Sequence, residues 1–367
     1  MKKILFLFPY APSYREPIYR LIDQYFDCDF HFCRSSHVQL KYMDYSKLKH
    51  VSFDLEEKMI VGEWCYYKHV RKLNLKDYDV ILMTGIFRNL SEWYVLFKNR
   101  WSKDRKKVIF WTHATYGKDG LVKKWIKKSM LCMADMVLVY GHYAKDYLIE
   151  QKMVKADQVD VIYNSLDYDK HRQSYQKETP NILQQHFGNA LPTLLFIGRL
   201  TIQKKLHMII ESIHQLSLQG HDYNLVLIGD GETREQLESL VEKYHLQQQV
   251  WFYGSCYDDE ESAQIIKYAD LCVSPGNVGL TAIHALTFGC PVITHDNYSN
   301  QMPEFEAIEN GKTGLFFHEN SQQSLTDTIQ RWFDTHPDRK AVSAQCQERI
   351  ALYYNPQHQL DILKKIL

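Results

Sequence analysis

The first half of the chain alternates short apolar runs with longer stretches of helical periodicity. The apolar runs predict buried parallel strands at residues 4–8, 30–33, 80–83, 108–111 and 136–139. Between them, apolar residues recur every three or four positions and predict helices at residues 14–25, 90–101 and 121–133. Strands that alternate with helices in this way indicate a doubly wound α/β domain.

A polar segment at residues 168–191 interrupts the alternation, and we interpret it as a linker. The pattern then restarts, with strands predicted at residues 194–197, 225–228, 251–253, 271–273 and 292–294. Helices are predicted at residues 205–218, 233–244 and 260–268. The fold expected is therefore α/β, with two Rossmann-like doubly wound domains that face each other across a cleft.

Ligands of such sheets bind beyond the carboxyl ends of the strands. In the first domain this edge is expected to gather residues 9–15, 84–89, 113–117, 141–143 and 164–167. In the second domain the best candidate is 271–294, where a strand, a Pro275-Gly276 turn and a helix from Gly279 follow one another. The N-terminus of that helix offers N–H groups and a positive dipole end to a phosphate. An ordinary strand–helix unit without a ligand gives the same pattern, so both interpretations stay open.

Composition places the chain among cytoplasmic globular proteins. Its 367 residues exceed what one core usually holds, and 45% of them are apolar. No apolar run is long enough to cross a bilayer, and residues 4–8 are too few for the core of a signal peptide. The eight cysteines form no CxxC pair, so we expect reduced thiols.

A net charge of zero conceals an asymmetry between the two halves. Residues 1–180 carry 31 Lys and Arg against 22 Asp and Glu, whereas residues 181–367 carry 13 against 22. A basic half would suit nucleic acid, but no nucleic-acid-binding motif is present and acids are interspersed among the basic residues. The asymmetry instead indicates two domains that face different partners, with nucleic acid not among them.

Four groups of residues follow predicted strands of the second half in a fixed order. They are Gly198-Arg199-Leu200 with Lys204, then 228–231 (IGDG), then Tyr253-Gly254, then Ser274-Pro275 leading through Gly279-Leu280 to 285–293. Glu304 and residues 311–315 come next. In this order and spacing, the second half resembles the retaining, nucleotide-sugar-dependent glycosyltransferases of family four, which have the GT-B fold. The first half matches only at His113 and residues 161–167, so the resemblance covers about half the chain.

The resemblance implies a retaining hexosyltransferase that needs no metal or other cofactor and takes a nucleoside-diphosphate sugar as its donor. Arg199 and Lys204, just past a strand end, would stabilise the diphosphate as its charge grows in the transition state. His113 would position the donor sugar. The donor would be held by Gly198, Gly254, Asn277, Val278, Gly279, Leu280, His284 and Glu304. The alternatives are that both cations only solvate a loop, and that His113 is satisfied in the core or on the surface.

The sequence departs from the family pattern at two positions. Family members usually carry two glutamates eight positions apart, one on the donor sugar and one on the ribose, whereas this chain has Gly276 and His284. One explanation is an unusual donor. The other is loss of catalysis, which would leave a binding partner of another transferase. Because Arg199, Lys204 and the turn at 278–280 persist, we favour an active enzyme.

The acceptor, a glycan or lipid-linked saccharide of bacterial-type surface polysaccharide or glycoconjugate synthesis, is expected in the first domain. Tyr10, Ser13, Tyr14 and Arg15 lie where its contacts would fall. Residues 120–133 combine four lysines with Trp125 and other apolar residues, a pattern typical of a helix at a membrane surface. Packing of the apolar side onto the domain is the alternative. We therefore expect peripheral contact with the inner face of a membrane.

The end of the chain, residues 351–367, places Leu360, Leu363 and Ile366 in helical register after a break at Pro356. GT-B proteins often return such a helix to the first domain. The predicted organisation is thus an acceptor-binding domain at 1–180, a nucleotide-sugar-binding domain at 190–350, and this returning helix at 351–367.

Overall fold

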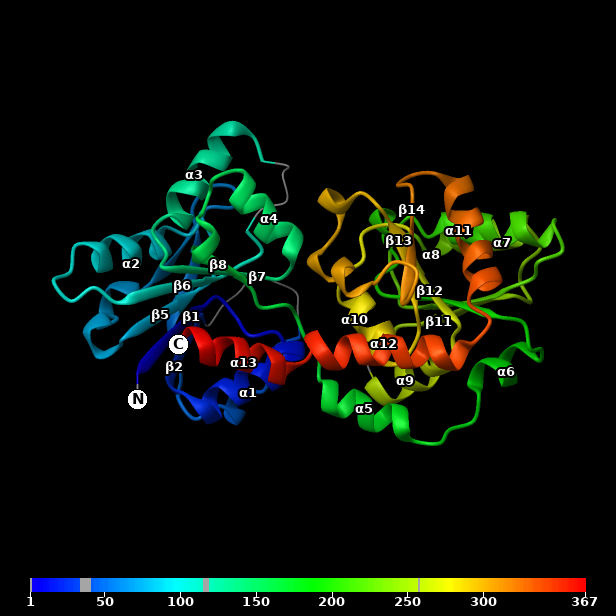
Figure 1. Ribbon diagram of the computed structural model, residues 1–367, viewed down its shortest axis with the longest axis horizontal. Coiled ribbons are helices and arrows are strands. Elements are labelled where there is room, and N and C mark those ends of the chain that lie inside the picture. The colour runs from blue at the N-terminus through cyan, green and yellow to red at the C-terminus, as the bar shows by residue number, and fades with distance from the viewer. Residues whose placement is uncertain (1, 34–40, 115–118, 257) are drawn as a thin grey trace. The chain divides into compact units, whose positions relative to one another are not determined.

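The computed structural model describes residues 2–33, 41–114, 119–256 and 258–367, and these form two compact units (Figure 1). Unit 1 comprises Met1–Asp167 and Pro356–Leu367, and unit 2 comprises Tyr168–Asn355. The segment interpreted as a linker is not irregular. It forms helices α5 (Tyr168–Gln176) and α6 (Ile182–Phe187), which belong to unit 2. Asn181 caps α6 by accepting hydrogen bonds from two backbone N–H groups. The polar composition of the segment gave no sign of this helix.

The sheet of unit 1 has, in the described residues, the order β4-β3-β2-β1-β5-β6-β7-β8. Its neighbouring strands are parallel except for the antiparallel pair β3 and β4. The strands are β1 (Lys3–Phe8), β2 (Asp27–Cys33), β3 (Val51–Met59), β4 (Cys65–Lys68), β5 (Val80–Met83), β6 (Lys107–Trp111), β7 (Met136–Val139) and β8 (Val159–Val161). The sequence pattern did not predict β3, because this strand is largely half-exposed and has no apolar run.

Alternating side chains of β1 enter two cores, one on each face of this sheet. Leu5 and Leu7 pack in one core, whereas Phe6 and Phe8 pack in the other. Helices α2 (Leu90–Arg100), α3 (Leu121–Leu131) and α4 (His142–Glu150) supply side chains to the first core. Helices α1 (Glu16–Tyr25) and α13 (Pro356–Ile366) supply the second. Burial on both faces explains why the central strands are continuous apolar runs.

The chain ends in unit 1 with α13, which lies beside α1 (Figure 1). Leu360 and Leu363 are fully buried there, and the ammonium of Lys107 donates to the carbonyl oxygen of Ile366 at 2.5 Å. The helix begins at Pro356, where the fixed φ of proline suits a first turn. Among the described residues, no helix is both long enough and apolar enough to cross a bilayer.

Unit 2 is built on a second parallel sheet, with the order β11-β10-β9-β12-β13-β14 in the described residues. Its strands are β9 (Thr193–Ile197), β10 (Asn224–Ile228), β11 (Val250–Gly254), β12 (Leu271–Ser274), β13 (Val292–His295) and β14 (Gly314–Phe317). Its remaining helices are α7 (His207–Ser217), α8 (Arg234–Lys243), α9 (Asp259–Tyr268), α10 (Leu280–Thr287), α11 (Gln322–Thr335) and α12 (Arg339–Tyr353). The two parallel Rossmann-like sheets confirm the predicted fold class.

Candidate functional site

At the carboxyl edge of the unit 2 sheet, the loops that follow β9 and β10 pack backbone against backbone. A Cβ atom on Gly229 would lie 1.9 Å from the carbonyl oxygen of Gly198, and one on Gly231 would lie 2.4 Å from that of Leu200. The N–H of Gly198 donates to the carbonyl of Ile228 at 2.9 Å. The glycines of the 228–231 motif therefore allow close approach of these two loops.

Two cations follow β9. Arg199 is exposed, and its guanidinium forms no hydrogen bond or ion pair with the described residues. Lys204 ends the 3-10 turn Ile202–Lys204, and its ammonium donates to the backbone oxygen of Asn277 at 2.6 Å and to Asn277 Oδ1 at 2.9 Å. Burial lowers the pKa of Lys204, while the charge of Glu304 acts to raise it. One cation is thus available to a ligand, and the other anchors the start of α10.

Helix α10 begins directly after Asn277, Val278 and Gly279. The N–H groups of Gly279 and Leu280 donate to no acceptor among the described residues. A Cβ on Gly279 would lie 3.9 Å from Glu304 Oε2, which places that buried carboxylate beside the helix start. The free N–H groups and the positive end of the helix dipole suit an anion.

The N–H of Val278, expected to contact the donor, is already engaged. It donates to Gln301 Oε1 at 2.7 Å. Gln301 Nε2 in turn donates to Thr294 Oγ1 and to the backbone oxygen of His295, both at 2.9 Å. Gln301 therefore ties the start of α10 to the end of β13. No motif or periodicity in the sequence marks this residue.

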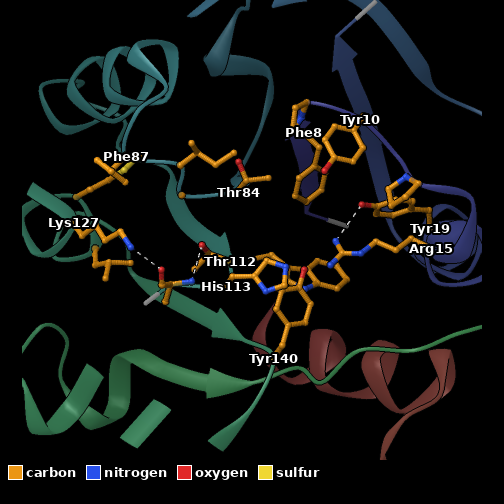
Figure 2. Close-up of a pocket in the computed structure, with 18 of the residues that line it drawn as sticks. Phe8, Tyr10, Arg15, Tyr19, Thr84, Phe87, Thr112, His113, Lys127 and Tyr140 are labelled. Carbon is orange, nitrogen blue, oxygen red and sulfur yellow. Dashed lines mark hydrogen bonds between the residues drawn. The ribbon is translucent and has the colours of Figure 1, made fainter. Parts of the chain in front are cut away.

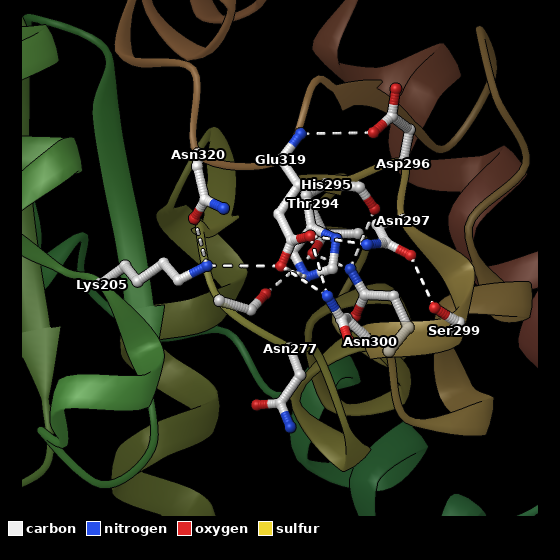
Figure 3. A network of polar contacts seen from close by, with 12 residues as sticks. Lys205, Asn277, Thr294, His295, Asp296, Asn297, Ser299, Asn300, Glu319 and Asn320 are labelled. Carbon is white, nitrogen blue, oxygen red and sulfur yellow. Dashed lines mark hydrogen bonds and ion pairs between the residues drawn. The ribbon is translucent and has the colours of Figure 1, made fainter. Parts of the chain in front are cut away.

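A network of polar contacts centred on Glu319 lies beyond β13 and β14 (Figure 3). Its carboxylate accepts hydrogen bonds from the side-chain amides of Asn297 at 2.7 Å and Asn300 at 2.8 Å. The ammonium of Lys205 lies 3.4 Å from it. Burial acts to raise the pKa of Glu319, but these hydrogen bonds outweigh it and lower the pKa. Because Lys205 adjoins Lys204, the network also fixes the turn that follows β9.

The predicted donor-site residues His284 and Gly254 have distinct surroundings, as does Gly276, where a family glutamate is replaced. The ring of His284 packs on His171, with centroids 5.0 Å apart, and its Nε2 has no hydrogen-bond partner among the described residues. Burial and His171 lower the pKa of His284 to about 3, so it is neutral. A Cβ on Gly276 would lie 2.0 Å from the carbonyl oxygen of Gln203. Gly254 has φ +90° and accepts a hydrogen bond from the N–H of Gly229.

Unit 1 contains a cavity of about 330 Å³ at the carboxyl ends of β1, β5, β6 and β7 (Figure 2). Its walls are largely aromatic, and they include Tyr10, Arg15, Thr84, His113, Lys127 and Tyr140. The structure thus brings together Tyr10, Tyr14, Arg15 and His113. Ser13 does not line the cavity, and its N–H donates to the backbone oxygen of Lys41. Residues 115–117 of the expected edge lie outside the described residues.

His113 lies beside Tyr140 in this cavity, with ring centroids 4.5 Å apart. The residue as a whole is exposed, although neighbouring atoms pack closely around its imidazole. Burial, together with the positive charge of Arg15, lowers the pKa of His113 to about 4. The imidazole is therefore neutral near pH 7 and can donate or accept one hydrogen bond through each nitrogen.

A buried carboxylic acid supports one wall of the cavity. Glu92 on α2 is fully buried, and it accepts hydrogen bonds from Thr84 Oγ1 and from the N–H of Ile86, the latter at 3.0 Å. Burial raises its pKa to about 7. Glu92 is not among the residues that the sequence predicts, although its place three residues after the helix cap Asn89 is a recognisable capping position.

Across the described parts of the chain, no three His, Cys, Asp or Glu residues gather in an arrangement that could hold a metal ion.

Comparison with known families accounts for both units. A model described as glycosyl transferases group 1 matches residues 180–349, and a model described as Glycosyltransferase Family 4 matches residues 18–170. The chain belongs to the family-four glycosyltransferases. The sequence resemblance that rested mainly on the second half is thus confirmed at the level of the family, and unit 1 carries its own family match.

Individual family members are similar over part of their length. An alpha-D-kanosaminyltransferase of Streptomyces kanamyceticus is 25% identical over 58% of this chain and 55% of that protein. A glycogen synthase of Francisella tularensis subsp. novicida is 32% identical over 41% of this chain and 33% of that protein. The chain therefore spans about half or less of the length of these curated relatives.

Two solved structures have the same fold over nearly the whole chain. Anabaena Alr3699/HepE in complex with UDP has a TM-score of 0.72 and 18% identity over 99% of both chains. The apo form of the lipopolysaccharide outer core galactosyltransferase WaaB has a TM-score of 0.73 and 17% identity, again over 99% of both. At this identity, the likeness establishes the fold alone.

Proposed function

We propose that this protein is a retaining, metal-independent hexosyltransferase that moves a sugar from a nucleoside-diphosphate donor to a saccharide or lipid-linked acceptor. The observation that carries the proposal is the cation-rich edge of unit 2. There the guanidinium of Arg199, the ammonium of Lys204 and the N–H groups of Gly279 and Leu280 follow β9 and β12, and neither that guanidinium nor these N–H groups have a partner in the part of the chain that the structure describes. Together they suit the diphosphate of a nucleotide sugar.

In the proposed reaction, the bond between the anomeric carbon and the diphosphate oxygen breaks while a bond to the acceptor hydroxyl forms on the same face. The hydroxyl proton passes to an oxygen of the leaving diphosphate. Arg199, Lys204 and the start of α10 stabilise the charge that develops on that diphosphate. His113, neutral and in the unit 1 cavity, orients a sugar hydroxyl. In this scheme no enzyme side chain acts as the nucleophile.

The donor sugar and ribose are held differently from the family pattern. No side chain fits at Gly276, because the backbone of Gln203 and Lys204 occupies the space that one would need. At His284 a single unpaired Nε2 takes the place of a carboxylate. We propose that Asn277, whose side chain lies beside Lys204, supplies the sugar contact, and that His284 offers one hydrogen bond to the ribose. Such a site would select a donor with fewer or different hydroxyl groups.

The test is nucleotide binding by the full chain, with UDP, GDP, CDP, dTDP and ADP compared by thermal shift and calorimetry. One nucleotide should raise the unfolding temperature. Arg199→Ala should weaken its binding by about tenfold or more, the loss expected for a charge-assisted phosphate contact. Arg331→Ala, which removes an exposed arginine on α11, is the matched control and should leave the affinity unchanged.

A binding-only role is the second candidate, and the side-chain-free position at Gly276 favours it. Turnover separates the two. The nucleotide that binds is supplied as its sugar conjugates together with saccharide acceptors, and release of the nucleoside diphosphate is measured. Release of the nucleoside diphosphate would establish the transferase, and binding without release would favour the binding-only role. No binding of any nucleotide by a folded protein would reject the transferase and leave the role of a binding partner of another transferase.

We further propose that the enzyme works at the inner membrane surface, in bacterial-type surface polysaccharide or glycoconjugate synthesis. The apolar residues at the start of α3 do not pack on unit 1, since Leu121 is 87% exposed, Val122 74% and Trp125 68%. Lysines on the same helix would meet anionic headgroups. Co-sedimentation with vesicles of phosphatidylglycerol should exceed that with phosphatidylcholine and fall in Trp125→Ser. If the variant co-sedimented as strongly as the wild-type protein, α3 would not be part of the membrane contact.

A further inference from the structure

Arg15 is a buried cation in the unit 1 cavity, and the proposed reaction gives it no role. It ends the 3-10 turn Ser13–Arg15 and is only 9% exposed. Its guanidinium lies over the rings of Trp111 and Tyr140, 5.1 Å from each centroid, and lines the unit 1 cavity (Figure 2). The side chain therefore presents its charge to the cavity rather than to open solvent.

The hydrogen bonds of Arg15 are far from complete. A guanidinium has five N–H donors and no acceptor. One of these groups, Nη1, contacts the hydroxyl of Tyr19 at 3.5 Å, which is a long hydrogen bond. The Tyr14 hydroxyl is the other group that interacts with it. Most of the donors of Arg15, a residue that lines the cavity, thus have no acceptor among the described residues.

No ion pair among the described residues involves Arg15, even though buried cations are normally paired. The acids nearest the cavity face other groups. Asp119 pairs with Lys127 at 2.6 Å, and Glu92 accepts hydrogen bonds from Thr84 and Ile86. The described protein surroundings therefore leave an excess of positive charge in an aromatic cavity.

We propose that this cavity binds an acidic sugar unit of the acceptor. The carboxylate or phosphate oxygens of that sugar would accept hydrogen bonds from the N–H groups of Arg15. The inference rests on the proposed function, because it assigns the substrate class of the acceptor. The cavity volume of about 330 Å³ falls at the lower end of the range for ligand pockets, which suits a single monosaccharide unit. Aromatic residues of the lining such as Tyr10 and Phe87 offer apolar ring surface to the sugar, and Arg15 supplies the counter-charge.

The competing explanation is that Arg15 only braces Trp111 and Tyr140 through its stacking. Stacking uses the face of the guanidinium plane, and leaves the N–H groups at its edge unbound. A bracing role predicts no preference between charged and neutral sugars. The proposal predicts a clear preference.

The test compares three sugars that share one ring and differ only at carbon 6. These are glucose with a hydroxyl, glucuronate with a carboxylate, and glucose 6-phosphate with a phosphate ester. Binding to the full chain is measured by calorimetry at low salt. At least one charged sugar should bind about tenfold or more tighter than glucose, as expected for a charge-assisted pair of hydrogen bonds. The better of the two charged sugars identifies the anion. Equal binding of all three, or no binding of either charged sugar, overturns the proposal.

Two variants connect the preference to Arg15. Arg15→Gln should reduce the advantage of the charged sugar to about twofold or less, the range left once the charge is gone. Since a buried arginine also contributes to packing, a second variant keeps it in place. Tyr14→Glu puts a carboxylate next to Arg15 as an internal competitor and should abolish the same preference. Persistence of the preference in either folded variant overturns the assignment to Arg15.

Nucleotide binding, measured on the same samples, separates this inference from the proposed function. Both variants lie in unit 1 and should retain the thermal shift with the nucleotide of the wild-type protein. If that shift is present and no charged sugar is preferred, the acidic acceptor is wrong while the transferase proposal stands. If no nucleotide binds but the charged sugar does, the donor assignment is the one that fails.

Discussion

The candidate ligand sites of the two units differ in the chemical groups that they offer to a ligand. In unit 2 the candidate donors include backbone N–H groups at the start of α10, beside the cations Arg199 and Lys204. In unit 1 the cavity is walled by side chains, and its charge comes from the buried Arg15. Main-chain groups recognise what nucleotide donors share, a diphosphate, whereas side chains can be exchanged without altering the fold. If the proposed function holds, this contrast would explain why the sequence motifs concentrate in the second half, with acceptor recognition assigned to individual residues of unit 1.

The largest expected effect lies at the close backbone contact between Gly276 and the turn that holds Lys204. In Gly276→Ala the new Cβ would meet the carbonyl oxygen of Gln203 at 2.0 Å, so the turn that holds Lys204 must move. The free energy of unfolding should fall by about 3 kcal/mol, as for a severe steric conflict, and nucleotide affinity should fall with it. Urea denaturation and calorimetry measure the two quantities.

Gly120→Ala is the matched control for this substitution. A Cβ there would have no atom within 4 Å, and the residue has φ −63°, so stability should change by less than about 0.5 kcal/mol. If Gly276→Ala were as stable as Gly120→Ala and still bound nucleotide, the backbone would have room for a side chain. A glutamate at position 276 would then be sterically possible, and its absence would need another explanation.

The second prediction concerns Glu92, which supports the cavity of unit 1. Its pKa is about 7 in the folded protein against an ordinary value of 4.5, mainly because of burial. Between these two pH values the folded state keeps a proton that the unfolded chain has lost, so stability falls as pH rises through this window. The loss should reach on the order of 3 kcal/mol at pH 8. Cys65 and Tyr67 of β4 also face Glu92, but burial raises both of their pKa values and keeps them neutral here.

Glu92→Gln should remove this pH dependence, because glutamine is uncharged and can still accept the N–H of Ile86. The difference in unfolding free energy between pH 5 and pH 8 is measured by urea denaturation of the wild type and the variant. Glu235→Gln, at an exposed position on α8 of unit 2, should keep the wild-type dependence. A wild-type curve that is flat over this range would mean that Glu92 ionises without cost.

The sequence predicts which segments lie at the carboxyl edge of each sheet. It does not predict which side chains contact one another there. The cavity lining by Tyr10, Thr84 and His113 follows from the rule that carboxyl ends of parallel strands meet, and segments containing all three were predicted at one edge. The burial of Arg15 was not predictable in this way. It depends on Trp111 and Tyr140, which come from two other strands and have no spacing relation to residue 15.

Residues that bind backbone groups of distant loops were missed for a related reason. Gln301 contacts the N–H of Val278 and the carbonyl of His295, and no periodicity reports such contacts. In segment 168–191, whole helices were missed in the same way. Its two short helices are mostly polar, so hydrophobic periodicity did not reveal them.

A third prediction tests the brace of unit 2. Gln301→Leu removes both functional atoms of the amide and leaves the buried N–H of Val278 and carbonyl of His295 without these partners. The unfolding free energy should fall by about 2 kcal/mol, the cost of unsatisfied buried polar groups, and nucleotide affinity should weaken. Gln323→Leu, exposed on α11, should lie within about 0.5 kcal/mol of the wild type. An unchanged nucleotide affinity in a destabilised Gln301→Leu would show that the start of α10 does not need this brace.

The smallest expected effect concerns the pKa of His113, and it shows how much of the lowering of that pKa is due to the charge of Arg15. Burial and Arg15 both lower the pKa of His113, to about 4, with burial the larger cause. Arg15→Gln removes the charge and keeps a polar side chain at the position, so the pKa of His113 should rise by up to about one unit and stay below its ordinary value. An NMR titration of the His113 ring resonances gives this pKa directly. Saturation with the preferred charged sugar should move the pKa in the same direction in the wild type, because the bound anion offsets Arg15. If the sugar bound and left the pKa of His113 unchanged, its anion would lie away from Arg15, and the cavity would be responding to the sugar ring alone.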